Sequence, residues 1–283
     1  MSTYRLKSIF EPASVAVIGG SPRARSAGRA VMRNLRESGY AGRIGWISPN
    51  HRTIDGIATV ARLRDLAWVP DLAIVTAPAA MVPGLIAEAA QAGVGAAVVL
   101  TDDLGPGRDA FAAAIEAAAR PHGMRILGPH CLGILSSHAR LNASIAARTP
   151  MAGDLALVSE SSAIAAALVE WGVSRSIGFS TVVSLGNAID IDFADLLDYL
   201  ATDRHTRAIL LYVEHVGNAR KFMSAARAAA RAKPVVVVKS GRLQPPQSIA
   251  EIGIRALAPT DAVHAAAFRR AGLTAEGFLQ AAF

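Results

Sequence analysis

The sequence predicts an α/β protein with two doubly wound domains. Short apolar or β-branched runs alternate with longer alanine-rich helical patterns along the 283 residues, which is the rhythm of βαβ units and a parallel sheet. A chain of this length can hold two cores, because single domains typically span roughly 100–200 residues. Residues 135–152 are poorer in periodicity and contain Pro150. We therefore expect domains at residues 1–135 and 136–283.

The alternation places the elements in order. In the first domain it predicts strands over residues 14–18, 43–47, 72–76, 96–101 and 125–127, and helices over 27–38, 79–92 and 108–119. In the second it predicts strands over 154–159, 179–184, 208–214 and 234–239, and helices over 162–172, 193–202, 219–232 and 261–271. Ligands of open α/β sheets bind beyond the carboxyl ends of the strands, so the loops after strands are the informative ones.

Composition indicates a compact protein, since 52% of the residues are hydrophobic and only 18% are charged. No apolar run reaches the roughly 18 residues of a membrane span. The start of the chain carries Arg5 and Lys7 and lacks the pattern of a secretory signal. The single cysteine, Cys131, fits a reducing compartment. We expect a soluble cytoplasmic protein with no membrane partner.

The charge balance favours a small anionic ligand. The formal net charge is +7, but the arginines are scattered and aromatic residues make up only 5%, so no stacking platform for nucleic acid is visible. No histidine stands at a zinc-ligand spacing from Cys131. We therefore expect neither a nucleic-acid partner nor a metal site.

The loop after the first strand resembles a phosphate cradle. Two glycines let the main chain come close to a ligand, two serines add hydroxyl donors and two arginines add charge: Gly19, Gly20, Ser21, Arg23, Arg25 and Ser26. The NAD fingerprint G-x-G-x-x-G is absent, and no carboxylate follows the strand at residues 43–47. The loop suits a ligand with more phosphate than NAD, such as coenzyme A (CoA). The alternative is a tight turn with solvated arginines.

Several segments resemble one family in order and spacing. They read VAVIGGS, GWISPN, DLAIVTAP, ILGPHCLG, LALVSESS, GFSTVVSLGNAIDIDFADLLDYLATD, AILLYVEHV and KPVVVVKSGR. They are similar to the NDP-forming acyl-CoA synthetases, including the succinyl-CoA synthetase α subunit and the synthetase-like region of bacterial protein acetyltransferases. The resemblance implies an N-terminal Rossmann-like CoA-binding domain followed by a flavodoxin-like domain.

The resemblance also implies where a cofactor would bind and what would accompany the chain. The expected contacts with CoA or acyl-CoA are Gly19, Gly20, Ser21, Arg23, Arg25, Ser26, Gly28, Pro49, Asn50, His51, Thr76, Pro78, Leu100 and Thr101. An ATP-grasp subunit or domain of the β type would supply nucleotide binding, and we expect an oligomer.

The family's catalytic step uses a phosphorylated histidine, and this chain departs from that pattern. Counting back from the motif at residues 267–272, Gly253 stands at the histidine position, so the catalytic residue is unknown. The substrate-pocket residues implied by the family are Ser159, Ser161, Ser162 and Glu214. Glu160 replaces the glutamine of the family's S-Q-S-G turn, and its charge would repel an incoming phosphate.

These observations leave three hypotheses about the function. The first is a CoA-binding or acyl-CoA-binding α-type subunit, or fragment of a synthetase-like protein, without the phosphohistidine. The second is an active acyl-CoA ligase α subunit that works with an ATP-grasp partner by a modified mechanism. The third, a nicotinamide-dependent oxidoreductase, is disfavoured by the loop spacing. His130 and Cys131 suggest a nucleophile pair, but adjacent residues seldom face each other; His264 is best explained as a surface or packing residue.

Overall fold

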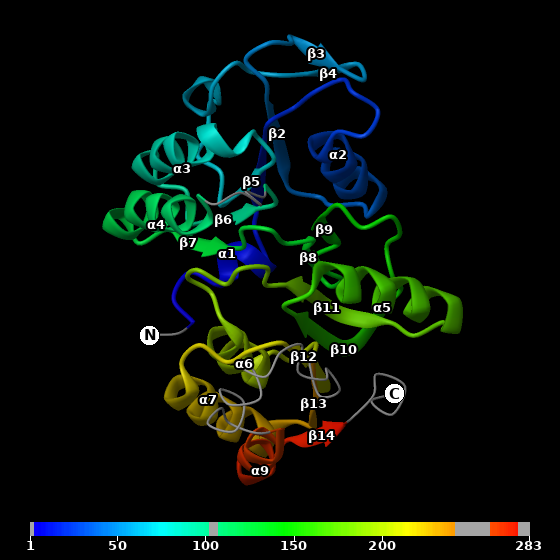
Figure 1. The fold of residues 1–283 in the computed structure, drawn as a ribbon. Coiled ribbons are helices and arrows are strands. Elements are labelled where there is room, and N and C mark those ends of the chain that lie inside the picture. Colours follow the sequence, from blue (N-terminus) through cyan, green and yellow to red (C-terminus); the bar gives the residue numbers. More distant parts are fainter. Residues whose placement is uncertain (1–2, 102–106, 241–260, 277–283) are drawn as a thin grey trace, which may run out of the picture.

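The computed structural model describes residues 3–101, 107–240 and 261–276. Two sheets, each flanked by helices on both faces, lie one beyond the other along the molecule (Figure 1). The chain completes the first sheet before it enters the second. The predicted α/β class with two doubly wound units is confirmed.

The first sheet is entirely parallel and has the order β2-β1-β5-β6-β7. Its strands are β1 (Ser14–Ile18), β2 (Arg43–Ile47), β5 (Leu72–Val75), β6 (Ala96–Val99) and β7 (Arg125–Leu127). Its helices are α1 (Lys7–Phe10), α2 (Ala27–Glu37), α3 (Val82–Gln91) and α4 (Arg108–Ala119). Short elements are the hairpin β3 (Thr53–Ile54) and β4 (Ile57–Ala58), and the 3₁₀ turns η1 (Leu63–Asp65), η2 (Ala79–Met81) and η3 (Arg120–His122).

Alternation along β1 explains why helices cover both faces of this sheet. Val15 and Val17 pack in the same core as Val31 and Leu35 of α2. Ala16 and Ile18 point the other way, into the core that α3 and α4 cover. All five residues of β1 are buried, as expected for a central parallel strand.

The second sheet has the order β14-β13-β12-β10-β11-β8-β9. Its strands are β8 (Gly133–Ser136), β9 (Leu141–Ser144), β10 (Ala152–Ser159), β11 (Phe179–Ser184), β12 (Ala208–Val213), β13 (Val235–Lys239) and β14 (Thr274–Glu276). Its helices are α5 (Ser162–Arg175), α6 (Phe193–Thr202), α7 (Ala219–Ala232) and α9 (Asp261–Arg270). The parallel strands follow the flavodoxin-like order, with β10 as first strand between β11 and β12.

Two strands that the sequence did not predict, β8 and β9, extend this sheet in antiparallel fashion. Their polar side chains Ser136, Asn142 and Ser144 have no exposed surface, so the segment lacks the apolar pattern of a buried strand. Every predicted strand and helix is present, with ends shifted by a few residues. The predicted domain boundary between residues 135 and 136 falls inside β8 and stays a prediction.

Buried polar contacts join the two halves. Asn34 of α2 is 3% exposed and donates to the carbonyl oxygens of Ser144 and Ala146, at 2.8 and 2.9 Å. Arg125 of β7 pairs with Asp195 of α6 at 3.2 Å. No helix in the described part of the chain is long and apolar enough to cross a bilayer.

Candidate functional site

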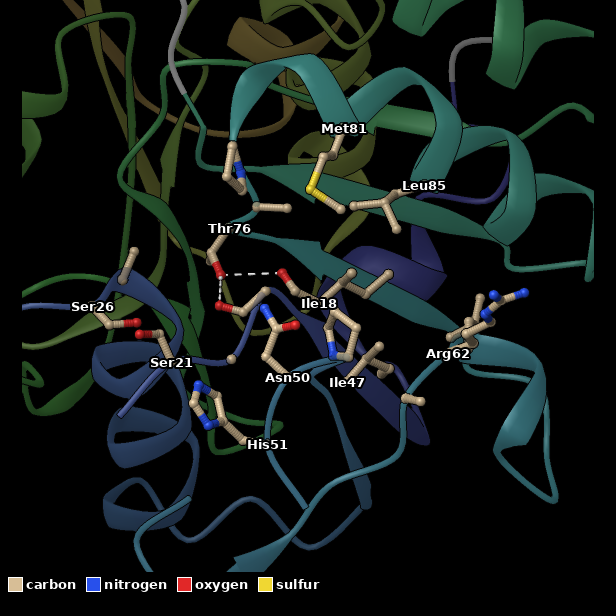
Figure 2. Close-up of a pocket in the computed structure, with 18 of the residues that line it drawn as sticks. Ile18, Ser21, Ser26, Ile47, Asn50, His51, Arg62, Thr76, Met81 and Leu85 are labelled. Carbon is tan, nitrogen blue, oxygen red and sulfur yellow. Dashed lines mark hydrogen bonds between the residues drawn. The ribbon is translucent and has the colours of Figure 1, made fainter. Parts of the chain in front are cut away.

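A cavity of about 1310 Å³ opens beyond the carboxyl end of β1. Strand β1 lies between β2 and β5 in the sheet. From β1 the chain continues to β2 on one side, and all later strands lie on the other side, so the end of β1 is the topological switch point of the first sheet. The loops after β1, β2 and β5 line the cavity together with η1 and α3 (Figure 2). Its volume exceeds the ~300–1,000 Å³ typical of small-molecule sites, so a large ligand fits.

The glycine loop approaches its neighbours so closely that side chains are excluded. Gly19 has φ +110°, and a Cβ there would lie 2.7 Å from the backbone nitrogen of Ala77. A Cβ on Gly20 would lie 2.4 Å from Nε1 of Trp46. The hydroxyl of Thr76 donates to the carbonyl oxygens of Ile18 and Gly19, at 3.1 and 3.2 Å (Figure 2). Thr76, directly after the neighbouring strand β5, therefore holds the glycine loop in place.

An arginine of α2 holds the loop, whereas the loop's own two arginines line the cavity. Arg29 of α2 donates to the carbonyl oxygen of Pro22 at 3.1 Å and binds Asp55 through two hydrogen bonds of 2.7 and 2.8 Å. Arg23 and Arg25 line the cavity, and their guanidinium groups have no partner among the described residues. Within the part of the chain that the structure describes, the site therefore offers positive charge that no acidic side chain pairs.

Helix α2 adds its amino end. Ser26 is the N-cap residue, but its side chain makes no capping hydrogen bond. The first-turn N–H groups of a helix have no intrahelical acceptor, and together with the helix dipole they favour an anion. An anion held by Arg23 and Arg25 would lie at this helix end.

The structure brings most of the predicted cofactor contacts together. Eleven line the cavity: Gly19, Gly20, Ser21, Arg23, Arg25, Ser26, Pro49, Asn50, His51, Thr76 and Pro78. The other three are not part of its lining. A Cβ on Gly28 would be 2.9 Å from the carbonyl oxygen of Gly19, Leu100 is 9% exposed, and the hydroxyl of Thr101 donates to the carbonyl oxygen of Ala77 at 2.6 Å.

Sequence reasoning missed one wall of the cavity. Residues Arg62, Leu63 and Arg64 come from η1 and the residue before it, and they face a stripe on η2 and α3 formed by Met81, Leu85, Glu88 and Gln91. The spacing of Met81, Leu85 and Glu88 is that of one helix face, which was the available signal. Nothing in the sequence indicates that η1 lies against it.

The serines predicted for a substrate pocket in the second domain make hydrogen bonds within the protein, and their role in a pocket stays a prediction. The hydroxyl of Ser159 donates to the carbonyl oxygen of Ser161 at 2.8 Å, and Ser161 caps α5 by accepting from the N–H of Ile164 at 3.4 Å. The hydroxyl of Ser162 lies 3.1 Å from that of Ser184 and donates to the carbonyl oxygen of His130 at 3.1 Å. These hydroxyls are already engaged.

Glu160 fills the equivalent switch point of the second sheet. Its carboxylate accepts from the backbone N–H groups of Glu214 and His215, the latter at 3.0 Å, and so joins the loop after β10 to the loop after β12. The Nδ1 atom of His215 is 3.5 Å from it. Burial raises the pKa of Glu160, although these backbone donors oppose the shift. The side chain of Glu214 is exposed, and its carbonyl oxygen accepts from Lys239 at 2.6 Å.

Cys131 and His264 do not line the cavity. Burial raises the pKa of the Cys131 thiol to about 12, and its sulfur lies 3.3 Å from the carbonyl oxygen of Val99, so Cys131 is a packing residue. His264 packs near Phe268, with ring centroids 6.3 Å apart. Gly253 lies outside the described residues. No cluster of three or more potential metal ligands occurs within the ranges that the structure covers.

Comparison with known families identifies both domains. Residues 13–137 match the family described as a CoA binding domain. Residues 152–280 match the family described as a succinyl-CoA ligase like flavodoxin domain. The first match contains the glycine loop and the cavity, and the second contains Glu160. The resemblance expected from the sequence is thereby confirmed.

Similar proteins agree with these matches. The chain is 38% identical over 279 residues to the acetate–CoA ligase (ADP-forming) I subunit alpha of Pyrococcus furiosus, covering 95% of this chain and 60% of that one. It is 35% identical to the acetate–CoA ligase (ADP-forming) of Methanocaldococcus jannaschii, covering 95% of this chain and 38% of that one.

A solved structure shows the same fold. The apo dinucleotide forming acetyl-coenzyme A synthetase 1 of Candidatus Korarchaeum cryptofilum superposes with a TM-score of 0.90 at 32% identity, over 98% of this chain and 60% of that one. The chain thus spans at most about three-fifths of these relatives. With both domains matched in this order, the chain consists of a CoA binding domain followed by a succinyl-CoA ligase like flavodoxin domain, and it is similar to the α-type region of the ADP-forming acyl-CoA synthetases.

Proposed function

We propose that the chain binds CoA or acyl-CoA in the cavity beyond β1, as the α-type part of an acyl-CoA synthetase-like protein. The observation that carries the proposal is the fixed glycine loop beside the amino end of α2, together with Arg23 and Arg25, whose guanidinium groups pair with no residue in the described ranges. The pyrophosphate of CoA is the anion that such a loop, helix end and pair of arginines would bind.

The test is calorimetric titration of the chain with CoA, acetyl-CoA and NADH. CoA and acetyl-CoA should bind with one site per chain, whereas NADH should not, because the loop lacks the NAD fingerprint and no carboxylate follows β2. Binding of NADH with comparable affinity, or no binding of CoA at millimolar concentration, would overturn the proposal.

We further propose that Gly253 leaves the chain without the family's phosphohistidine. A glycine has no side chain to carry phosphate, and Glu160 adds negative charge at the second switch point, where it accepts two backbone N–H groups. Exposure to ATP or acetyl phosphate should leave no acid-labile phosphate on the protein. A phosphohistidine located by mass spectrometry would refute this part of the proposal and leave CoA binding untouched.

The partner implied by the family is an ATP-grasp subunit or domain of the β type. Since the relatives are named acetate–CoA ligases, acetate is the first acid to test. The chain, such a β-type partner, ATP, acetate and CoA should give no thioester if Gly253 has abolished the phosphoryl relay. Acetyl-CoA formation would instead establish the alternative, an active ligase with a modified mechanism.

A further inference from the structure

We infer that a groove on the outer side of α2 is a docking surface for an acidic helical segment of a partner protein. The groove has a volume of about 950 Å³ and is lined by residues of α2, of the β3–β4 hairpin and of the segment after β9. Figure 1 shows α2 between the hairpin and β9. Among the described residues, the α2 groove shares Arg25, Ser26 and Ala27 with the cavity beyond β1 and is otherwise separate from it.

The basic side chains of the α2 groove form one stripe. Arg29, Arg33 and Arg36 stand at positions i, i+4 and i+7 of the helix, so they lie on the same face. Asp55 binds Arg29 at 2.7 Å, whereas Glu37 reaches Arg33 only at 3.9 Å. The guanidinium group of Arg36 has no partner within the part of the chain that the structure covers. The stripe therefore keeps positive charge that an acidic occupant would pair.

Apolar side chains line the same groove, and one of them is held exposed by the backbone. Met32 and Ile57 belong to the lining, and Ile145 is 38% exposed. The N–H of Ile145 donates to the carbonyl oxygen of Leu132 at 3.0 Å, and Asn34 binds the carbonyl oxygens of the residues on either side of Ile145. Ile145 is thus presented by a fixed segment, beside other apolar side chains, as in a contact surface.

These features select one kind of occupant. A second copy of this chain is disfavoured, because its formal net charge of +7 would bring like charges together. Single-stranded nucleic acid stacks on exposed aromatic rings, whereas Trp46, the aromatic residue of the groove, is 3% exposed. An amphipathic helix with carboxylates at positions i, i+4 and i+7 would match the spacing of the arginines, with apolar side chains against Ile145.

The experiment uses a fluorescein-labelled helical peptide in which pairs of glutamates alternate with pairs of leucines. The same peptide with glutamine in place of glutamate is its neutral counterpart. Fluorescence anisotropy should show the wild-type chain binding the acidic peptide about tenfold or more tightly than the neutral one. Because exposed charges are screened by ions, added salt should reduce this difference.

Two variants of the groove separate charge from apolar contact. The double variant Arg33→Glu/Arg36→Glu should weaken the acidic peptide by about tenfold or more, because it replaces attraction by repulsion. Ile145→Ser should weaken the acidic and the neutral peptide by similar factors, because it removes an apolar contact that both peptides would make.

Helix α7 offers the matched control. Its exposed face carries Arg220, Arg227 and Arg231, which line a smaller hollow of about 620 Å³. Arg227→Glu/Arg231→Glu changes the net charge by the same amount as the α2 double variant. Its affinity for the acidic peptide should stay close to that of the wild-type chain.

Circular dichroism establishes that each variant is folded, and all the substituted side chains are exposed. Absence of peptide binding by the wild-type chain at millimolar concentration would overturn the inference. Equal losses in the α2 and α7 double variants would also overturn it, because they would show a general attraction between a basic protein and an acidic peptide. A failure of the chain to bind CoA would remove the proposed function and leave this inference untouched.

Discussion

The two sheets have the same order of parallel strands, yet their switch points differ. In the first sheet the loops after β1 and β5 separate around a cavity, and Arg23 and Arg25 stay unpaired within the described structure. In the second, the loops after β10 and β12 are joined through Glu160. Strand order therefore determines where a candidate site lies, while a few side chains determine whether hydrogen-bond donors remain free to bind a ligand there.

The largest expected effect comes from filling the space around Gly19. Gly19→Ala should lower the free energy of unfolding by about 2–5 kcal/mol, through positive-φ strain and the contact with Ala77, and should abolish CoA binding. Urea denaturation and calorimetry measure the two effects. The matched control is Gly56→Ala, which has φ +74° but no atom within 4 Å of the added Cβ, so that only the strain remains. Equal losses in the two variants would contradict the crowding argument.

Removing one loop cation should have the next largest effect. Arg23→Ala or Arg25→Ala should weaken CoA by about 1–3 kcal/mol, if each guanidinium makes a charge-assisted contact, and the loss should shrink as salt is added. Arg227→Ala, on the exposed face of α7, is the control and should leave affinity unchanged. Unchanged affinity in both loop variants would leave the cradle without its proposed cations.

The two N-cap serines allow a direct test of the difference between the switch points. Ser161→Ala removes a capping bond and should lower stability by about 1 kcal/mol without changing CoA affinity. Ser26→Ala removes no capping bond, so it should leave stability nearly unchanged and weaken CoA. Thermal denaturation and titration of both variants give the comparison. The same pattern of loss in both would contradict it.

The smallest effect concerns pH. Because burial raises the pKa of Glu160 in the folded chain, the folded state holds its proton more tightly than the unfolded state. This contribution to stability is present below the ordinary value of 4.5 and is lost as the pH rises through the raised pKa. Glu160→Gln cannot titrate, so its unfolding free energy should fall less over that window than that of the wild-type chain. Parallel pH profiles in urea denaturation would refute the assignment.

The features that were predicted correctly are those that a local sequence pattern determines. Apolar runs and alanine-rich repeats located the main strands and helices, and the glycines and arginines after β1 located the loop. It missed β8 and β9 because their buried Ser136 and Asn142 break the apolar pattern. It also missed Glu88, since a cavity wall built from η1 and α3 depends on packing between segments far apart in the chain.

CoA binding in the cavity is tested most directly by a crystal structure of the chain grown with saturating CoA. We expect the pyrophosphate at residues 19–26, at the amino end of α2 and within hydrogen-bond reach of Arg23 or Arg25. An empty cavity, or CoA bound only elsewhere on the protein, would contradict it.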